Sequence, residues 1–226
     1  MKRSELNRYI AEASAYFAEH HFVLPPFADW TPEEWRQHGG EANELRNQRL
    51  GWDITDFASG DFDKIGLTMF TLRNGLGAGG KISKVYAEKI MLVREGQVTP
   101  YHYHGHKNED IINRGEKGSG RLLVQLYNST EDGQLAQSPV SVVCDGVRRQ
   151  LEAGGTVILG PGESITLTPH LYHQFYAIDG WALIGEVSSV NDDDTDNYFL
   201  EKQPRYPALI EDEPPLRLLC TEYQLA

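Results

Sequence analysis

The sequence predicts a mainly β protein whose strands form a jelly-roll barrel, with helices near the amino terminus packed against the outside of the barrel. Three observations point to this class. From Leu67 onward the chain consists of short runs rich in β-branched and aromatic residues, separated by Gly, Pro, Asn and Asp. The chain contains 22 Gly and 11 Pro, a content that suits a protein with many turns. Its 226 residues are an ordinary length for one β-barrel domain.

The first predicted element is an amphipathic helix that begins at Ser4 and ends near His20. Ser4 is a favourable residue for the N-cap of a helix. Apolar residues then recur at helical spacing and form one face: Leu6, Ile10, Ala13, Tyr16 and Phe17. We expect this apolar face to cover a sheet.

A second helix is predicted to begin at Thr31. Thr31 suits the N-cap, Pro follows at the first helical position, and two Glu stand in the first turn. Gly39 and Gly40 are expected to end this helix. The Leu24-Pro-Pro-Phe run between the two helices predicts an extended linker. Residues 41–65 are ambiguous, and we expect residues 50–57 to wrap the barrel without forming a regular element.

The predicted strands lie between residues 67 and 190. They are 67–73, 83–94, 97–104, 108–114, 121–127, 139–144, 147–151, 156–160, 164–168, 171–178 and 181–190. Many antiparallel strands joined by Gly-rich turns are typical of a jelly-roll barrel. We therefore expect one domain over 1–226, in which 1–65 form a helical wrap, 66–190 the barrel core and 191–226 a carboxy-terminal extension. The extension from Arg205 onward is expected to pack along the outside of the barrel and to help form an oligomer.

The overall charge of the chain is strongly negative, at −12, with an isoelectric point of about 5.1. Binding to nucleic acid or to an anionic membrane requires clustered Lys and Arg, so we expect neither partner. No stretch approaches the roughly eighteen apolar residues of a membrane span, and the first residues lack the apolar core of a signal peptide. Cys144 and Cys220 are far apart and have no metal-type spacing, which predicts reduced structural thiols. Together these features predict a cytoplasmic protein.

Residues 96–115 contain the side chains that point to metal chemistry. His102 and His104 are two residues apart, and side chains two apart on a strand lie on the same face. A turn at Gly105 followed by a returning strand brings Glu109 back toward the same point. Two neutral imidazoles and one carboxylate form a chelate for a divalent transition metal. Burial of Glu109 as an anion is costly without a partner, and the metal supplies that partner.

A fourth ligand is expected from a later part of the chain, where His170 and His173 are the candidates. His173 belongs to an alternating row over 171–177 that suits an interior face. His170 directly follows a Pro and fits a turn, so the alternation favours His173. His106 lies after the turn at Gly105, and we interpret it as a turn or surface residue.

Two lysines are candidates for the same site. Lys89 is the polar member of an apolar alternating row over 85–93, so it either extends to a rim or points into a polar cavity. We favour the cavity because this strand immediately precedes the His102 hairpin. Lys107 shares its parity with Glu109, which directs its ammonium toward the metal. A hairpin lysine in water is the alternative for Lys107.

Glu186 is the candidate base, because it alternates with Ala182 and Ile184 on one face. Burial in such a row raises the pKa of a carboxyl group, whereas a nearby lysine or metal charge lowers it. The balance of these two effects is what a general base near neutral pH needs. A structural ion pair with Lys89 is the alternative.

Two levels of family resemblance follow from these stretches. The pattern Gly-x5-His-x-His-x4-Glu-x5-Gly over 96–115 resembles the first cupin motif, although the gap before the last Gly is slightly shorter. Residues 161–175 are similar to the second cupin motif, whose metal ligand stands before x-Phe, as His173 does here. Three longer strings resemble the cupin-type D-lyxose isomerases: Tyr86-Ala-Glu-Lys-Ile-Met, Glu109-Asp-Ile-Ile-Asn-Arg-Gly and Gly185-Glu-Val-Ser-Ser-Val-Asn-Asp-Asp-Asp. The similarity extends to Leu24-Pro-Pro-Phe and Asp212-Glu-Pro, so it covers nearly the whole chain.

The resemblance implies a cupin barrel that binds a divalent metal through His102, His104, Glu109 and His173. These four ligands leave two neighbouring positions of an octahedral ion for substrate oxygens, which suits Mn²⁺ first, and also Co²⁺, Fe²⁺ or Ni²⁺. The implied activity is that of an aldose-ketose isomerase, which interconverts D-lyxose and D-xylulose and, as a related pair, D-mannose and D-fructose.

In this interpretation Glu186 transfers a proton through a cis-enediol, and Lys107 and Lys89 hold oxygens of the sugar. A metal-assisted hydride shift is the alternative route. The competing functions are a cupin Fe(II) dioxygenase and a non-catalytic sugar-binding cupin. Cupins often pair through terminal segments, so we expect a homodimer. Residues 192–194 are an acidic cluster, which is either a solvated turn or part of the rim of the site.

Overall fold

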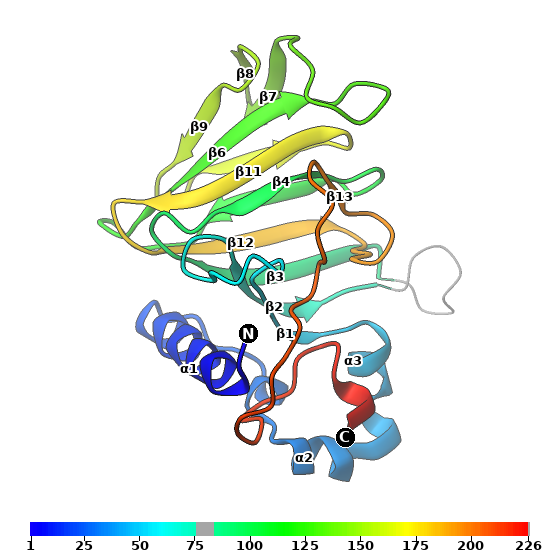
Figure 1. The fold of residues 1–226 in the computed structure, drawn as a ribbon. Helices are drawn as coiled ribbons and strands as arrows, with labels where there is room; N and C mark the ends of the chain where they lie inside the picture. Colours follow the sequence, from blue (N-terminus) through cyan, green and yellow to red (C-terminus); the bar gives the residue numbers. More distant parts are fainter. Residues whose placement is uncertain (76–83, 226) are drawn as a thin grey trace.

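A computed structural model describes residues 1–75 and 84–225 of the chain and confirms the mainly β class (Figure 1). The strands are β1 (Gly51–Thr55), β2 (Leu67–Arg73), β3 (Tyr86–Val93), β4 (Thr99–Tyr103), β5 (Glu109–Asn113), β6 (Arg121–Asn128), β7 (Val140–Cys144), β8 (Val147–Leu151), β9 (Thr156–Leu159), β10 (Ser164–Leu167), β11 (Leu171–Ile178), β12 (Ala182–Ser189) and β13 (Tyr198–Phe199). One sheet has the order β1-β2-β3-β12-β5-β10-β7-β8 and the other has the order β13-β4-β11-β6-β9. All the strand pairs are antiparallel.

The main core lies between the two sheets. It contains inward side chains of both, such as Met91 and Ile184 from the larger sheet and Val124 and Phe175 from the smaller one. Successive side chains on a strand point to opposite faces, so the same strands also present a second set of residues to the outside. The predicted strand 83–94 is observed as β3, and its first residue, 83, lies outside the described residues.

The outer face of β1, β2 and β3 is covered by helix α1 (Arg3–Glu19), as Figure 1 shows. The predicted apolar face of the helix forms a second core with Trp52, Phe70 and Leu92 of the sheet. The predicted N-cap at Ser4 is two residues too late, because α1 begins at Arg3. The N-cap is Lys2, whose backbone N–H donates to the Glu5 carboxylate at 2.8 Å. Ser4 instead donates its hydroxyl to Asp212 of the carboxy-terminal extension.

The second helix, α2 (Pro32–His38), begins as predicted. The Thr31 hydroxyl accepts the backbone N–H of Glu34, and the Glu34 carboxylate accepts the N–H of Thr31. Gly39 follows with a φ of +47°, a conformation that Gly adopts at little cost. The remaining helical segments are short: η1 (Pro26–Asp29), η2 (Gly39–Ala42), α3 (Asn43–Asn47) and η3 (Tyr223–Leu225). No helix within the described residues is long and apolar enough to cross a membrane.

The expectation that residues 50–57 form no regular element was wrong, because Gly51–Thr55 form strand β1 at the edge of the larger sheet. All five of its residues are buried, so the strand lacks the alternation of apolar and polar residues that identifies a half-exposed strand. Trp52 and Ile54 face α1, whereas Asp53 faces the interior of the barrel, where it pairs with Arg205.

The carboxy-terminal extension packs largely on the helical layer as well as on the outside of the barrel. Leu218, Cys220 and Tyr223 form a small core with Trp35 of α2. Buried Arg3 at the start of α1 pairs with Glu211 at 2.6 Å and also with Glu222. The extension therefore packs against the amino-terminal segment of the chain. Its last residue, 226, lies outside the described residues.

Candidate metal centre and active site

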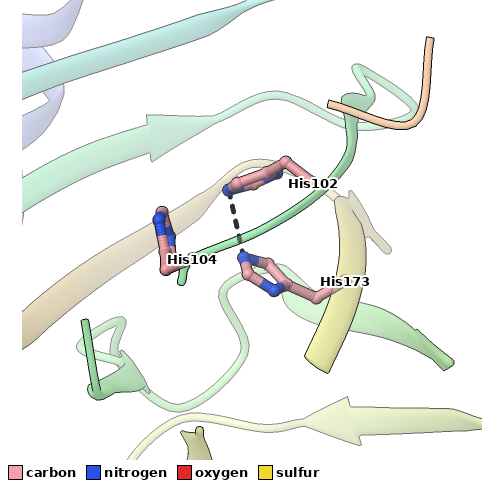
Figure 2. A group of neighbouring side chains, drawn as sticks. All are labelled: His102, His104 and His173. Atoms are coloured by element: carbon pink, nitrogen blue, oxygen red, sulfur yellow. Dashed lines mark hydrogen bonds between the residues drawn. The ribbon is translucent and has the colours of Figure 1, made fainter. Parts of the chain in front are cut away.

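Three histidines meet inside the barrel on the smaller sheet (Figure 2). Strands β4 and β11 are antiparallel neighbours, and His102 stands directly opposite His173 in their register. His104 lies two residues beyond His102, so its side chain points to the same interior face. One ring nitrogen of each residue lies within 4.8 Å of the other two.

The backbone fixes which ring nitrogen of each histidine bears the proton. The Nδ1 atom of His102 lies 2.8 Å from the carbonyl oxygen of Pro100, and that of His173 lies 3.0 Å from the carbonyl of Leu171. The Nδ1 atom of His104 lies 2.9 Å from the backbone carbonyl of Asp196. A carbonyl oxygen only accepts hydrogen bonds, so each Nδ1 must be the donor. In a neutral ring, Nε2 then presents a lone pair.

These lone pairs converge without a donor between them. Burial lowers the pKa of His173 to about 4, and burial together with the neighbouring rings lowers the pKa of His102 well below its ordinary value. Both rings are therefore neutral at pH 7, yet their Nε2 atoms lie 3.0 Å apart, as the dashed line in Figure 2 marks. Nε2 of His104 has no hydrogen-bond partner within 1–75 and 84–225. A divalent cation satisfies all three lone pairs, so these residues fit a metal ion.

Glu109, at the start of β5, brings a carboxylate to the same point. Its Oε1 lies 3.3 Å from Nε2 of His173 and 3.5 Å from Nε2 of His104. Burial raises the pKa of Glu109, but the charge of Lys107 and the neighbouring His104 outweigh this effect and hold that pKa well below its ordinary value. Glu109 is therefore ionised and adds negative charge beside the three rings. The structure thus brings together the four residues that the sequence predicts as ligands.

The two other candidate histidines lie elsewhere. His106 is exposed to solvent. His170 is also exposed, adopts a φ of +63° in the turn before β11, and lies against the ring of Tyr103. The alternation along β11 therefore placed His173 correctly inside the barrel.

The three predicted catalytic residues form one buried cluster with Glu109. The Lys107 ammonium lies 2.7 Å from Oε2 of Glu109 and 3.0 Å from Oε1 of Glu186. The Lys89 ammonium lies 3.3 Å from the same Glu186 oxygen. The ion pair between Lys89 and Glu186, which sequence reasoning held as an alternative, is thus present. Both of its members line the cavity, so Lys89 points into the interior and not to a rim.

Opposing charges keep these groups ionised despite their burial. Burial alone lowers the pKa of Lys107, but Glu109 and Glu186 raise it above its ordinary value. Burial alone raises the pKa of Glu186, but Lys107 and Lys89 lower it below its ordinary value. At neutral pH the cluster therefore holds two carboxylates beside the Lys107 ammonium group, next to the neutral imidazoles of His102 and His173.

A single cavity contains these groups. Apolar side chains line part of its wall: Phe57, Leu67, Met69, Met91, Ile111, Phe175 and Phe199. Charged and polar groups gather around the rest, which is the composition expected of a site for a polar substrate.

Sequence reasoning missed Asn191, although it lies within a string quoted for the family resemblance. Its side-chain oxygen accepts hydrogen bonds from Lys89 at 2.7 Å and from Lys107 at 3.3 Å. Its amide group donates to Asp193 at 2.8 Å. Asn191 therefore contacts both of the ammonium groups that pair with Glu186.

Arg205 was also missed as a wall residue of the cavity, whereas Asp193, another wall residue, belongs to the acidic cluster 192–194, for which the rim of the site was one of two interpretations. Arg205 pairs with buried Asp53 at 2.5 Å and lies 3.9 Å from Asp193. Asp53 is distant in the chain from both Asp193 and Arg205, so no local pattern could have joined them. Within the acidic cluster 192–194, Asp193 lines the cavity, whereas Asp192 and Asp194 are exposed.

The whole chain can be compared with known protein families. The model of the D-lyxose isomerase family matches residues 1–223. The chain belongs to the D-lyxose isomerase family. The D-lyxose/D-mannose isomerase of Escherichia coli O157:H7 is 49% identical over 227 residues, which cover 99% of each chain. The D-lyxose/D-mannose isomerase of Serratia proteamaculans is 48% identical and covers 99% of this chain and 98% of its own.

Solved structures of L-ribose isomerases share the fold of this D-lyxose isomerase family member. The enzyme of Cellulomonas parahominis with L-ribose superposes with a TM-score of 0.60 at 14% identity, over 93% of this chain and 98% of that chain. The enzyme of Acinetobacter sp. DL28 with L-ribose gives a TM-score of 0.57 at 17% identity, over 89% and 93%. At this identity the likeness bears on the fold alone, and it confirms the predicted cupin barrel.

Proposed function

We propose that the protein interconverts D-lyxose and D-xylulose, and also D-mannose and D-fructose, as a metal-dependent isomerase. Membership of the D-lyxose isomerase family makes the chain a sugar isomerase, and the particular sugars are the proposed part. The observation that carries the proposal is a cavity in which two buried carboxylates and two lysines adjoin three histidines. The curated relatives at 49% and 48% identity, both named D-lyxose/D-mannose isomerase, support the choice of sugars.

We propose that His102, His104, Glu109 and His173 hold a divalent metal, with Mn²⁺ first and Co²⁺, Fe²⁺ or Ni²⁺ as alternatives. A set of three imidazoles and one carboxylate suits these ions. When bound, the metal would polarise the sugar carbonyl and make the proton on C2 more acidic.

Glu186 is the proposed proton shuttle between C2 and C1. It is ionised in the folded protein, so it can take the C2 proton of the aldose and return it to C1, through a cis-enediol. In the same conversion the hydroxyl proton on O2 is lost and O1 gains one, so that the product is the ketose. Lys107 and Lys89 remain beside Glu186 and stabilise the negative charge that develops on the sugar oxygens.

The test is turnover by purified protein reconstituted with Mn²⁺, assayed on a panel of aldoses without oxygen. We expect D-lyxose and D-mannose to be converted to ketoses under these conditions, whereas a dioxygenase requires oxygen. D-lyxose labelled with deuterium at C2 should lose label to water if Glu186 transfers a proton. Complete retention of the label in the product would favour a hydride shift, and absence of turnover on every aldose would contradict the proposed function.

We also propose that the protein is a cytoplasmic homodimer. Cys144 and Cys220 are buried free thiols, which suits a reducing compartment. Exposed apolar side chains occur in the terminal segments, with Val23 at 88%, Ile210 at 60% and Leu216 at 43% exposure. Light scattering coupled to size-exclusion chromatography tests the dimer directly.

A further inference from the structure

Asp196 is a buried carboxylate that the proposed reaction does not use. It is 6% exposed and lies in the segment between β12 and β13. Its Oδ1 accepts the backbone N–H groups of Gly105 at 2.8 Å and of His106 at 3.0 Å. Its Oδ2 accepts the N–H of Lys107 at 3.0 Å. Three consecutive backbone amides therefore converge on one side chain.

The loop that Asp196 holds connects two residues of the site. It begins directly after His104 and ends at Lys107, whose ammonium contacts Glu109 and Glu186. The backbone carbonyl of Asp196 also accepts the Nδ1 proton of His104 at 2.9 Å. One residue thus fixes the tautomer of His104 through its backbone and the start of the Lys107 side chain through its carboxylate.

The contact between the Asp196 carboxylate and the backbone of 105–107 favours an acidic residue at position 196 and a glycine at position 105. Successive backbone N–H groups form a concave site for an anion, and hydrogen bonds to a carboxylate are stronger than those to a neutral acceptor. A Cβ atom at Gly105 would lie 3.1 Å from Oδ1 of Asp196 and 3.2 Å from the ring of Tyr198. Gly105 therefore permits the close approach of the segment that contains Asp196.

Asp196 is itself held against the strand that contains the metal site. Directly after it, Tyr198 and Phe199 form β13 and pair with Tyr103 and His102 of β4. The rings of Tyr198 and Tyr103 stack at 4.9 Å. The segment therefore pairs with β4 through the residues that precede His104. The Asp196 carboxylate binds the loop 105–107, which follows His104.

We propose that Asp196 is a positioning residue that orients His104 for the metal and Lys107 for the sugar. The effects on turnover and on metal affinity rest on the proposed function, whereas the effect on the loop does not. Outer partners of metal ligands change metal affinity or activity by about 10–100-fold when removed. Asp196 positions both His104 and Lys107, so we expect its replacement to change both metal affinity and activity.

Two variants of Asp196 distinguish the contacts of its carboxylate from the contact of its backbone carbonyl with His104. Asp196→Ala removes all three acceptor contacts and leaves the backbone carbonyl to His104. Asp196→Asn keeps the volume and can keep Oδ1 as acceptor, but its amide group then faces the N–H of Lys107. The matched control is Asp192→Asn. Asp192 is exposed, lies in the same segment and also accepts three hydrogen bonds, two from backbone N–H groups and one from the Thr195 hydroxyl, all within its own turn.

The first measurement needs neither metal nor substrate. Hydrogen exchange of the amides of residues 105–107 in the metal-free protein should become faster, by about tenfold or more, in Asp196→Ala and should stay unchanged in Asp192→Asn. Chelator competition with Mn²⁺ should then show about 10–100-fold weaker affinity in Asp196→Ala. In Asp196→Asn, kcat for D-lyxose should fall more than KM rises, because Lys107 acts on charge that develops in the transition state.

Two results would overturn the proposal. One is faster exchange in Asp196→Ala with unchanged Mn²⁺ affinity and unchanged kcat, because Asp196 would then cap a loop and nothing more. The other is an equal loss in Asp192→Asn, because the effect would then come from the order of the whole segment. Failure of the proposed function appears separately, as wild-type protein that binds Mn²⁺ and turns over no aldose. If Asp196→Ala does not fold, the isosteric Asp196→Asn provides the same three readouts.

Discussion

Replacement of Lys107 with Met should destabilise the metal-free protein strongly at neutral pH and much less in mild acid. Lys107 is buried, and its ammonium lies 2.7 Å from Glu109 and 3.0 Å from Glu186, which are buried as well. Met has a similar length and no charge, so the change removes the cation and little of the packing. It leaves Glu109 without an ammonium partner, while Glu186 retains Lys89 at 3.3 Å.

The magnitude follows from the loss of one partner of a buried ion pair. Such a loss costs about 3–5 kcal/mol, because the remaining charge is buried and unpaired. For a domain of this size, a change of 1 kcal/mol in the free energy of unfolding shifts Tm by about 2–4 °C, so we expect a decrease of about 6–20 °C.

The direction of the pH effect follows from the two carboxyl groups. In the wild-type protein the folded-state pKa values of Glu109 and Glu186 are lowered, so their contribution to stability is present above the unfolded-state value of about 4.3 and is lost as pH falls through the folded-state values. Without Lys107, burial raises both folded-state pKa values. The variant can then protonate these groups in mild acid, so its deficit relative to wild type should be largest at pH 7 and should shrink toward about pH 4.5.

The assay is urea unfolding in EDTA at the two pH values, with Lys64→Met as the control. Lys64 pairs with Asp61 on the surface, where an ion pair contributes about 0–1 kcal/mol, so the control should behave like wild type. Addition of Glu109→Gln to Lys107→Met should recover part of the loss, because it removes the buried carboxylate that is left without an ammonium partner. A deficit of the same size at both pH values, or one below about 1 kcal/mol, would refute this electrostatic account.

Three further outcomes are expected. His173→Ala should abolish Mn²⁺ binding measured by calorimetry, whereas His170→Ala, at an exposed turn, should bind like wild type; the reverse result would assign the fourth ligand to His170. Glu186→Gln should keep the metal but lower kcat by about 10²–10⁴-fold, and full activity would exclude Glu186 as the proton shuttle. Thr31→Ala should lower the free energy of unfolding by about 1 kcal/mol without a change in kcat, since it removes the side-chain cap of α2 far from the cavity; an unchanged unfolding midpoint would show that this cap contributes little.

For residues on regular strands, the alternation of side chains along the sequence was sufficient to predict which of them point into the barrel. Lys89 and Glu186 stand in apolar rows with a period of two, and the larger sheet directs both to the same cavity. His102 was predicted from the His-x-His spacing, and His173 from strand alternation and the resemblance to the second cupin motif; their cross-strand register brings them together. A strand enforces this alternation locally, so it can be read from a few residues.

The same reasoning failed where the burial of a residue, or the residues that it contacts, depended on distant parts of the chain. Strand β1 is buried on both faces, so its sequence has no alternation to recognise. The segment that contains Asn191 and Asp196 has little regular structure, and its sequence resembles a solvated turn.

The sequence by itself determined the class of fold, the faces of the strands and which residues could form a metal site, because strand alternation and the His-x-His spacing are local. Only the tertiary structure decided that Asn191 holds both lysines, that Asp196 holds the loop between His104 and Lys107, and that Arg205 reaches Asp53. These contacts join segments that are distant in the chain. Their partners are set by how the two sheets and the carboxy-terminal extension pack, and no local pattern encodes that packing.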